Sequence, residues 1–393
     1  MTGDSVLSSF IAIYLAEKKI KHNLHYNQLD PEQLKPTSNQ LINNYSNILE
    51  TPYLLSEYKR KIKFIQNTKI FLYSKNINEQ AVISSRYKYP IYAIDNRIRI
   101  ISFDNKIKDF IRKDVIKLTN QKSEDGIIIL GGYKNKVQFE SIHHNTGFEP
   151  TKVRKFVSIN LQVNSSLLED FNGTTSFLIE EFGEIICYPF LHYSNEVGIS
   201  MVVNFNINTT IDLKTEFKNS FDTLNYIKQV IQNKIYLLNK LIDNATPFDK
   251  NVFEGFVKPY FMSPANIKND KLYLGVGSAV MNTDPIVGQG FNFGIKLSKI
   301  IADTIINEVS NKFAIRDTIN KYSIEKLNKL RRITDIFTGG NKENPAFGAF
   351  ITEMITNKSL SSFWFEGIED IDHYFPWIED ELETKRILEK FRN

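Results

Sequence analysis

The sequence of 393 residues has a single cysteine, Cys187, which excludes an internal disulfide and a cysteine zinc site. Cys187 lies in an apolar run from 185 to 188, so we expect a small buried side chain rather than a nucleophile. One free cysteine suits a reducing cytoplasm. No apolar run approaches the roughly 18 residues that a membrane span needs, and no signal peptide is evident. These absences favour a cytoplasmic protein without a membrane partner.

A strong net charge is lacking as well. The formal charge is +4, from 49 basic and 45 acidic side chains. The basic runs at 18–21 and 59–63 are mixed with apolar residues, a pattern typical of a solvated helix face over a core. The sequence therefore does not indicate a nucleic-acid partner. Hydrophobic residues make up 42% of the chain, which is typical of a folded globular protein, and the length suffices for two domains.

The first 150 residues alternate between strand and helix patterns. Gly3 leads into an apolar helix capped by Asp4 or Ser5, and only Met1 and Thr2 precede Gly3 where a first strand should lie. The run from 126 to 132 is continuously apolar and ends in glycines, as in a strand buried on both faces. The other elements expected here are a strand at 22–26, a strand at 70–73 and a helix at 95–112.

The pattern changes near Thr151. Four strand-like runs separated by turns predict an antiparallel sheet of hairpins, at 156–163, 175–180, 184–190 and 197–206. Apolar residues then repeat at helical spacing from Ile227 to Ile242. A strand at 271–277, a helix at 289–308 and helices to the end of the chain complete the prediction. This order implies a nucleotide domain that is interrupted by an inserted substrate domain.

The most specific motif follows the strand at 271–277. There, a loop stiffened by Pro285 carries two glycines on either side of Gln289 and leads into a helix. A helix N-terminus stabilises an anion or an electron-rich carbonyl, such as the N1–C2=O edge of a reduced flavin ring. The glycines alone are equally consistent with a helix start that binds nothing.

The stretch from Asp284 to Asn292 resembles the C-terminal FAD motif of group A and group E flavoprotein monooxygenases, and most of all the epoxidase subunit of styrene and indole monooxygenases. The stretch 93–97 is similar to the helix start that carries a flavin-side arginine in that family, and the stretch 125–133 is similar to its buried strand near the FAD diphosphate. Order and length match over nearly the whole chain, with low identity outside the motif.

The resemblance implies an α/β fold with an FAD-binding Rossmann-like domain of the GR2 type at 1–150 and 246–310. A substrate-binding antiparallel sheet with a helix interrupts it at 151–245, and C-terminal helices follow at 311–393. The flavin-side loop would be Pro285, Ile286 and Val287. The implied cofactor-binding residues are Gly3, Ser5, Ser8, Arg97, Gly131, Gly277, Ser278, Asp284, Pro285, Gly288, Gln289, Gly290 and Asn292.

The sequence also departs from the family at three places. The Gly-x-Gly-x-x-Gly fingerprint that seats a pyrophosphate has serine at its second and third glycines, Ser5 and Ser8. The acidic residue that holds the ribose falls near Asn27, and the aspartate that bonds the ribityl chain falls at Ser278. Each change removes a polar contact worth about 1–3 kcal/mol, so FAD binding is expected to be weak.

Two functions remain open. In the first, the chain is a two-component monooxygenase that takes reduced FAD from a separate NAD(P)H–flavin reductase. The family mechanism then implies that O2 forms a C4a-(hydro)peroxyflavin, which epoxidises or hydroxylates a small apolar or aromatic substrate. In the second, the chain is a binding or scaffold subunit that has lost FAD. Cyclisation and halogenation are weaker alternatives, and the two tryptophans have no Trp-x-Trp spacing. A homodimer is one candidate assembly.

Candidate substrate residues lie in the inserted sheet. Aromatic and thioether side chains there could line a cavity or simply form core, and His192 is expected near a hairpin end. The adjacent His143 and His144 favour a solvated turn over a metal site, and no metal is expected. The aromatic segment from Phe363 to Trp377 either caps the cavity or packs on the helices. The proposed substrate residues are Phe177, Tyr188, Phe190, His192 and Met201.

Overall fold

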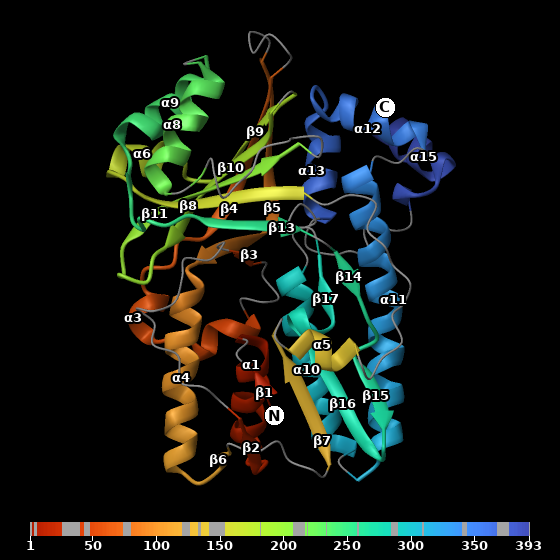
Figure 1. Ribbon diagram of the computed structural model, residues 1–393. Coiled ribbons are helices and arrows are strands. Elements are labelled where there is room, and N and C mark those ends of the chain that lie inside the picture. Colours follow the sequence, from red (N-terminus) through yellow and green to blue (C-terminus); the bar gives the residue numbers. More distant parts are fainter. Residues whose placement is uncertain are drawn as a thin grey trace.

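A computed structural model gives the fold (Figure 1). The structure describes residues 2–3, 6–25, 40–42, 48–73, 80–119, 126–132, 135–140, 154–180, 182–206, 217, 219–232, 234–257, 259–283, 290–308, 310–339, 344–367 and 377–392. The predicted turn with His143 and His144 lies outside these residues. In the described part of the chain the helices and strands form a mixed α/β fold with two main sheets.

The smaller sheet is built around buried parallel strands. Its order is β1 (Thr2–Gly3), β7 (Ile127–Gly131), β16 (Lys271–Val276) and β15 (Ala265–Lys268). The first three strands run parallel, and β15 pairs antiparallel with β16. The sequence leaves only Met1 and Thr2 before Gly3 for a first strand. The structure has this strand as the two-residue β1. It was missed because two residues carry no periodic pattern.

A second parallel pair consists of β2 (His22–Leu24) and β6 (Ile116–Leu118). The apolar helix α1 (Val6–Glu17) contacts both β2 and β7, and it also packs on α4 (Asn96–Arg112) and α10 (Gly290–Glu308). Nearly every residue of α1 is buried, which agrees with its almost uniformly apolar sequence. The predicted helices at 95–112 and 289–308 are thus confirmed, with Asp95 as the N-cap of α4.

The larger sheet has nine strands. The predicted hairpin strands are confirmed as β8 (Arg154–Gln162), β9 (Thr174–Ile179), β10 (Gly183–Leu191) and β11 (Val197–Phe205). The remaining strands are β3 (Gln40–Ile42), β4 (Ile65–Tyr73), β5 (Gln80–Ile94), β12 (Thr246–Pro247) and β13 (Phe253–Val257).

Strand pairing joins residues from both sides of the expected domain boundaries. Strand β4 pairs in parallel with β9, so β3, β4 and β5 belong to the larger sheet although they lie before residue 150. Strands β12 and β13 pair with β8, although they follow residue 245. The larger sheet is therefore mixed rather than purely antiparallel. Sequence order could not reveal this, because pairing between distant strands depends on tertiary contacts.

Helices cover the two faces of the larger sheet unequally. On one face lie α6 (Ser165–Asp170), α8 (Ser220–Ile231) and α9 (Tyr236–Asn244), and the other face is turned toward the smaller sheet (Figure 1). The sequence predicted one helix from Ile227 to Ile242, but two form. Gln232 takes a left-handed conformation with φ of 47° and ends α8. The apolar spacing continues across this break, so periodicity alone did not show it.

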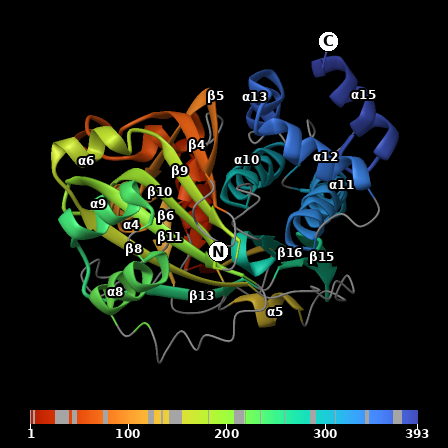
Figure 2. The ribbon, with the colours of Figure 1, turned by 90° about the horizontal axis from the view of Figure 1, so that it is seen from above.

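C-terminal helices pack along one side of both sheets (Figure 2). They are α11 (Lys312–Gly339), α12 (Pro345–Met354), α13 (Lys358–Gly367) and α15 (Glu381–Arg392). Helix α11 contacts β15 and α10, and α13 contacts β5. No helix in the described ranges is both long and apolar enough to cross a membrane.

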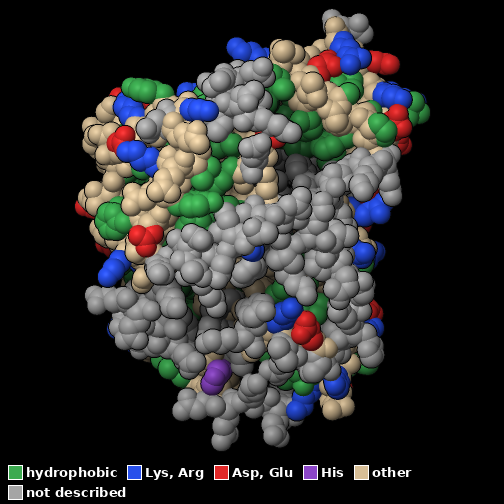
Figure 3. Space-filling view, turned by 45° about the horizontal axis from the view of Figure 1, so that its top comes forward, with side chains coloured by type: hydrophobic (Ala, Val, Ile, Leu, Met, Phe, Trp, Pro, Cys, Tyr) green, Lys and Arg blue, Asp and Glu red, His purple; other side chains and the backbone are tan. Residues whose placement is uncertain are grey.

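Short elements join these layers. They are η2 (Thr51–Tyr53), α3 (Ser56–Lys59), α5 (Lys136–Glu140), η4 (Gly277–Ala279), β14 (Tyr260–Phe261) and β17 (Met281–Asn282). On the described surface in Figure 3, lysine and arginine side chains are interspersed with acidic ones and do not gather into one patch. The basic side chains of the runs at 18–21 and 59–63 are exposed as predicted, but these runs lie at and beyond the ends of α1 and α3 and do not form helix faces.

Candidate functional site

The carboxyl ends of the parallel strands in the smaller sheet carry glycines that lie in one row. Gly3 pairs with Gly131, and Gly131 pairs with Val276, the residue before Gly277. Gly277 has a φ of 55°, a left-handed conformation that glycine adopts without a steric penalty. Ligands of open α/β sheets bind outside the carboxyl ends of the strands. The structure therefore brings three of the predicted cofactor residues to the edge where a ligand is expected.

Two helices begin close to this edge. Helix α1 begins at Val6, shortly after Gly3, and α10 begins at Gly290. Both are long enough for a developed N-terminal dipole, which favours an anion. Asn292 is buried in the first turn of α10. The predicted residues Ser5, Asp284, Pro285, Ile286, Val287, Gly288 and Gln289 lie outside the described residues.

The first turn of α1 packs tightly against α10 and η4. A Cβ atom added at Gly294 would lie 2.6 Å from Cδ1 of Leu7, and one added at Gly277 would lie 2.9 Å from it. Leu7 thus occupies the space that these two glycines leave. Ser8, the predicted third fingerprint position, is fully buried in α1.

Ser278 stands at the position where the family has an aspartate. Its side chain is exposed in η4, and its backbone oxygen accepts a hydrogen bond from the hydroxyl of Tyr260. Ser278 follows Gly277 at the carboxyl end of β16.

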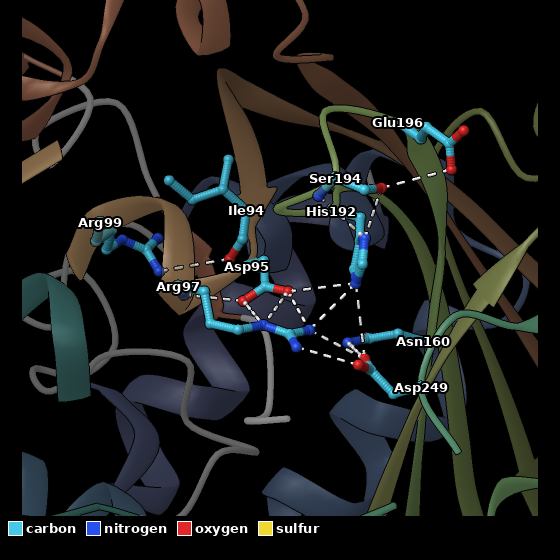
Figure 4. A network of polar contacts seen from close by, with 9 residues as sticks. All are labelled: Ile94, Asp95, Arg97, Arg99, Asn160, His192, Ser194, Glu196 and Asp249. Carbon is cyan, nitrogen blue, oxygen red and sulfur yellow. Dashed lines mark hydrogen bonds and ion pairs between the residues drawn. The ribbon is translucent and has the colours of Figure 1, made fainter. Parts of the chain in front are cut away.

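Arg97 lies in a buried network of charges instead of at an open edge (Figure 4). Its Nη2 donates to Oδ2 of Asp95 at 2.6 Å and to Oδ2 of Asp249 at 3.0 Å, and Nη1 donates to Oδ1 of Asp249 at 3.0 Å. Nε donates to both oxygens of Asp95. Its guanidinium carbon lies 3.9 Å from the ring centroid of Tyr193. Every guanidinium nitrogen of Arg97 has an acceptor within the protein, which differs from the predicted flavin contact.

His192 belongs to the same network and not to an open cavity wall. Its Nε2 lies 3.1 Å from Nη2 of Arg97, and its Nδ1 lies 2.8 Å from the hydroxyl of Ser194. Its ring stacks on Phe248, with the centroids 4.2 Å apart. His192 is buried and directly follows β10 in the turn that leads to β11, so the predicted place at a hairpin end is confirmed.

The charges of this network shift the pKa values of its members. Burial would raise the pKa of Asp249, but its hydrogen bonds from Arg97 and its contact with His192 outweigh burial and lower the pKa to about 2. Burial would lower the pKa of Arg97, but hydrogen bonds to Asp95 and Asp249 raise it above its ordinary value. The ion pairs of the network therefore persist at neutral pH. Asp249 was not predicted from the sequence, because it lies 152 residues from Arg97 and carries no local motif.

The five predicted substrate residues lie on opposite faces of the larger sheet. Tyr188 and Phe190 are buried in the core shared with the smaller sheet. Phe177 and Met201 are buried on the other face, in the core formed with α8 and α9. Side chains alternate along a strand, so residues of one sheet cannot all face one cavity. The structure thus separates Phe177 and Met201 from Tyr188, Phe190 and His192.

Two further predictions concern buried side chains. Cys187 is fully buried beside Tyr188, and burial raises the pKa of its thiol above the ordinary value, so the prediction of a buried hydrophobe is confirmed. In the C-terminal aromatic segment, the rings of Phe365 and Tyr87 of β5 meet edge to face at 6.0 Å. Trp364 and Trp377 pack against Phe350 within the helices.

Comparison with solved structures finds the same fold in several enzymes. The flavin-dependent brominase Bmp2 aligns with a TM-score of 0.65 and 14% identity over 100% of this chain and 98% of its own. PqsL of Pseudomonas aeruginosa aligns with a TM-score of 0.59 and 12% identity over 95% of this chain and 96% of its own. The 2,6-dihydroxypyridine-3-hydroxylase of Arthrobacter nicotinovorans aligns with a TM-score of 0.60 and 12% identity over 86% of this chain and 92% of its own.

No protein-family model and no curated protein matches the sequence. At these identities the alignments establish the shared fold. The names cover bromination and ring hydroxylation, so the fold by itself leaves the reaction open.

Proposed function

We propose that this chain is a flavin-dependent monooxygenase that oxygenates a small apolar or aromatic substrate. The observation that carries the proposal is the row of Gly3, Gly131 and Gly277 at the carboxyl edge of the smaller sheet, beside the N-termini of two helices. Glycines let a ligand approach the backbone closely, and the helix N-termini favour its negative groups. Among proteins of this fold, PqsL is named a probable FAD-dependent monooxygenase, and its complex with 2-aminobenzoylacetate supports an aromatic substrate.

The residues of this edge fit FAD in part. Gly3, Gly131 and Gly277 would hold the cofactor through their backbone, and the first turn of α10 would face the electron-rich edge of its ring. Ser278, where the family has an aspartate, lacks the carboxylate that would bond the ribityl chain, and Ser8, where the family has a glycine, adds a buried side chain to the first turn of α1. We therefore infer weak binding, in which reduced FAD arrives from a separate NAD(P)H–flavin reductase. Bound reduced FAD would supply the redox chemistry that activates O2.

The protein's own part is to position the substrate and exclude water. Tyr188 and Phe190 are buried on the face of the larger sheet that is turned toward the smaller sheet, and they are our candidates for the wall against which a flat apolar substrate packs. Burial raises the pKa of Tyr188 to about 12, so its hydroxyl, which interacts with Ser200, stays protonated at neutral pH. The smaller sheet with its helices would form the FAD-binding part, and the larger sheet the substrate-binding part.

An anaerobic titration with oxidised and with dithionite-reduced FAD tests this function. We expect the reduced form to bind more tightly than the oxidised form. Binding is measured by flavin fluorescence and absorbance. FMN is the matched control ligand, because it lacks the adenosine half that the altered fingerprint would hold. We expect FMN and FAD to bind within about tenfold of each other, since little adenosine contact remains to be lost. Indole and styrene are then tested for O2-dependent product formation against release of hydrogen peroxide.

A non-catalytic subunit that keeps the fold without FAD is the second candidate. It is favoured by the packing of Leu7 between Gly277 and Gly294 and by the complete pairing of Arg97. Binding of neither flavin form by the folded protein would support this candidate and contradict the oxygenase.

A further inference from the structure

The buried network around Arg97 contains more negative than positive charges (Figure 4). It holds the carboxylates of Asp95 and Asp249 and the single guanidinium of Arg97. Asp95 and Arg97 are almost fully buried, and the side chain of Asp249 is 14% exposed. With a neutral His192, the network therefore carries one uncompensated negative charge. A buried charge without a partner costs free energy, so a further positive charge is stabilised here.

His192 is the residue that can supply this charge. Its side chain is 5% exposed, and its Nε2 lies 3.7 Å from Oδ2 of Asp95 and 3.7 Å from Oδ2 of Asp249. Nε2 also lies 3.1 Å from Nη2 of Arg97, which repels a protonated ring. The two attractions outweigh this one repulsion, because Coulomb energy falls only with the inverse of distance. A proton on His192 thus makes the network neutral.

A chain of polar groups connects His192 with the surface. Its Nδ1 lies 2.8 Å from the hydroxyl of Ser194, which donates to Oε2 of Glu196 at 3.4 Å. Ser194 and Glu196 are both exposed. A neutral Nδ1 accepts the backbone N–H of Ser194 at 3.3 Å, whereas a protonated Nδ1 donates to the hydroxyl. Ser194 therefore has a contact for each state of the ring, and the buried histidine can exchange a proton with water.

The network joins two parts of the fold. Asp95 and Arg97 lie at the start of α4, which packs on α1, and His192 begins the turn between β10 and β11. The backbone N–H of Asp95 also donates to the backbone oxygen of Leu191 at 2.9 Å. The ring of His192 is held in place by its stack on Phe248. The electrostatic attraction between the turn and α4 therefore depends on the charge of His192.

Further polar side chains face this turn. Tyr193 and Glu196 lie on it, Lys61 donates to the backbone oxygen of Asn195 at 2.9 Å, and Tyr58 of α3 lies near Asp95. Burial, together with the charges of Glu57 and Asp95, raises the pKa of Tyr58, so that this hydroxyl stays neutral. Histidine is the only one of these side-chain types that ordinarily titrates between about pH 5 and pH 8.

We propose that Asp95, Arg97, His192 and Asp249 form a proton-dependent clamp. With a proton on His192, the network is neutral and the turn between β10 and β11 is held against the start of α4. As the pH rises, the proton leaves to water past Ser194, the network becomes negatively charged, and the turn loosens. Water is the only proton acceptor that this step needs. The clamp acts whether or not flavin binds.

Hydrogen exchange of the turn at 192–196 and of the first turn of α4 tests the clamp. It is measured between about pH 5.5 and about pH 8 and corrected for the intrinsic pH dependence of exchange. We expect the protection of both segments in the wild type to fall about tenfold over this range, the effect of one pKa unit of differential interaction. Peptides of α8 and α9 should keep their protection, which excludes unfolding of the whole molecule.

Two variants should abolish this response. His192→Gln keeps a polar side chain that cannot take up a proton, and Asp249→Asn removes the negative charge that the proton balances. In both, we expect the protection of the turn to be independent of pH. His25→Gln, at a half-buried histidine outside the network, is the matched control and should respond as the wild type does.

A second measurement on the wild type keeps the test valid if His192→Gln does not fold. In protein labelled with 15N-histidine, the ring resonances that change in Ser194→Ala belong to His192, because the hydroxyl of Ser194 contacts its Nδ1. These resonances should change from the charged to the neutral pattern over the pH range in which the turn loses protection.

Protection of the turn that does not change with pH overturns the clamp. A pH response that persists in both His192→Gln and Asp249→Asn overturns it as well. Loss of the His192 proton outside the range in which protection falls would assign the response to another group, with the same consequence.

Discussion

At the scale of single residues, two neighbouring arginines of α4 are paired to different extents. Arg97 is saturated by Asp95 and Asp249, while Nη2 of Arg99, beside α10, has no hydrogen-bond partner in the described part of the chain. A buried charge that loses its partner is strongly destabilising, because the remaining charge stays desolvated. The Arg97 network therefore contributes to stability, and this contribution depends on pH through Asp249.

Asp249→Asn should lower the free energy of unfolding at pH 7 by about 1–2 kcal/mol. Asp249 titrates at about 2 in the folded protein and near about 4 when unfolded, so its contribution is complete above pH 4 and disappears as the pH falls toward 2. Urea denaturation at pH 7 and pH 3 should show a smaller difference between variant and wild type at the lower pH. Asp270→Asn, at an exposed aspartate, is the control and should change stability by less than about 0.5 kcal/mol. A difference that is independent of pH would contradict this prediction.

At the scale of elements, the contact between α1 and α10 determines how much room remains near the sheet edge. The two helices approach closely because Gly294 has no side chain, and Leu7 fills the space. The interior is packed so densely that one added methyl group changes the free energy of unfolding. The position of α10 therefore depends on Gly294, which lies outside the motif from Asp284 to Asn292.

Gly294→Ala should lower the free energy of unfolding by about 1–2 kcal/mol, because the new Cβ would meet Cδ1 of Leu7. Gly348→Ala is the matched control in α12, where no atom lies within 4 Å of the added Cβ. It should raise the free energy of unfolding by about 0.5–1 kcal/mol through helix propensity. In a Leu7→Ala background the cost of Gly294→Ala should vanish, and thermal or urea unfolding of the four variants measures this coupling. Additive effects would show that the two side chains do not compete for space.

At the scale of the whole molecule, the two sheets are joined through β5 and the C-terminal helices. Strand β5 is 15 residues long, pairs with β3, β4 and β10, and is covered by α13. Phe365 of α13 meets Tyr87 of β5, whose hydroxyl lies 2.9 Å from that of Thr174 in β9. This contact links the end of the chain to the centre of the larger sheet.

Phe365→Ala should lower the free energy of unfolding by about 3 kcal/mol, because it removes a buried ring from this junction. Hydrogen exchange should accelerate in β5 and α13, while α8 and α9 on the opposite face keep their local protection. Phe313→Ala, at an exposed phenylalanine of α11, should change stability by less than about 1 kcal/mol. Equal loss of protection on both faces would show instead that the molecule opens as one unit.

The sequence by itself determined the local elements and the general α/β class. Apolar periodicity located α1, α4 and α10, and alternation located β8 to β11, because these signals depend on neighbours along the chain. The glycines at 3, 131 and 277 were chosen on a family resemblance, and the pairing of Gly131 with Gly3 and with Val276 puts them at one edge of the smaller sheet.

The tertiary structure alone decided which residues share a face or a charge network. It placed β4 and β5 in the larger sheet, separated Phe177 and Met201 from Tyr188 and Phe190, and paired Arg97 with Asp249. It also left Arg99 with an unpaired nitrogen beside Phe291. The physical reason is that strand pairing, burial and ion pairing join residues far apart in the chain, where a linear pattern carries no distance information.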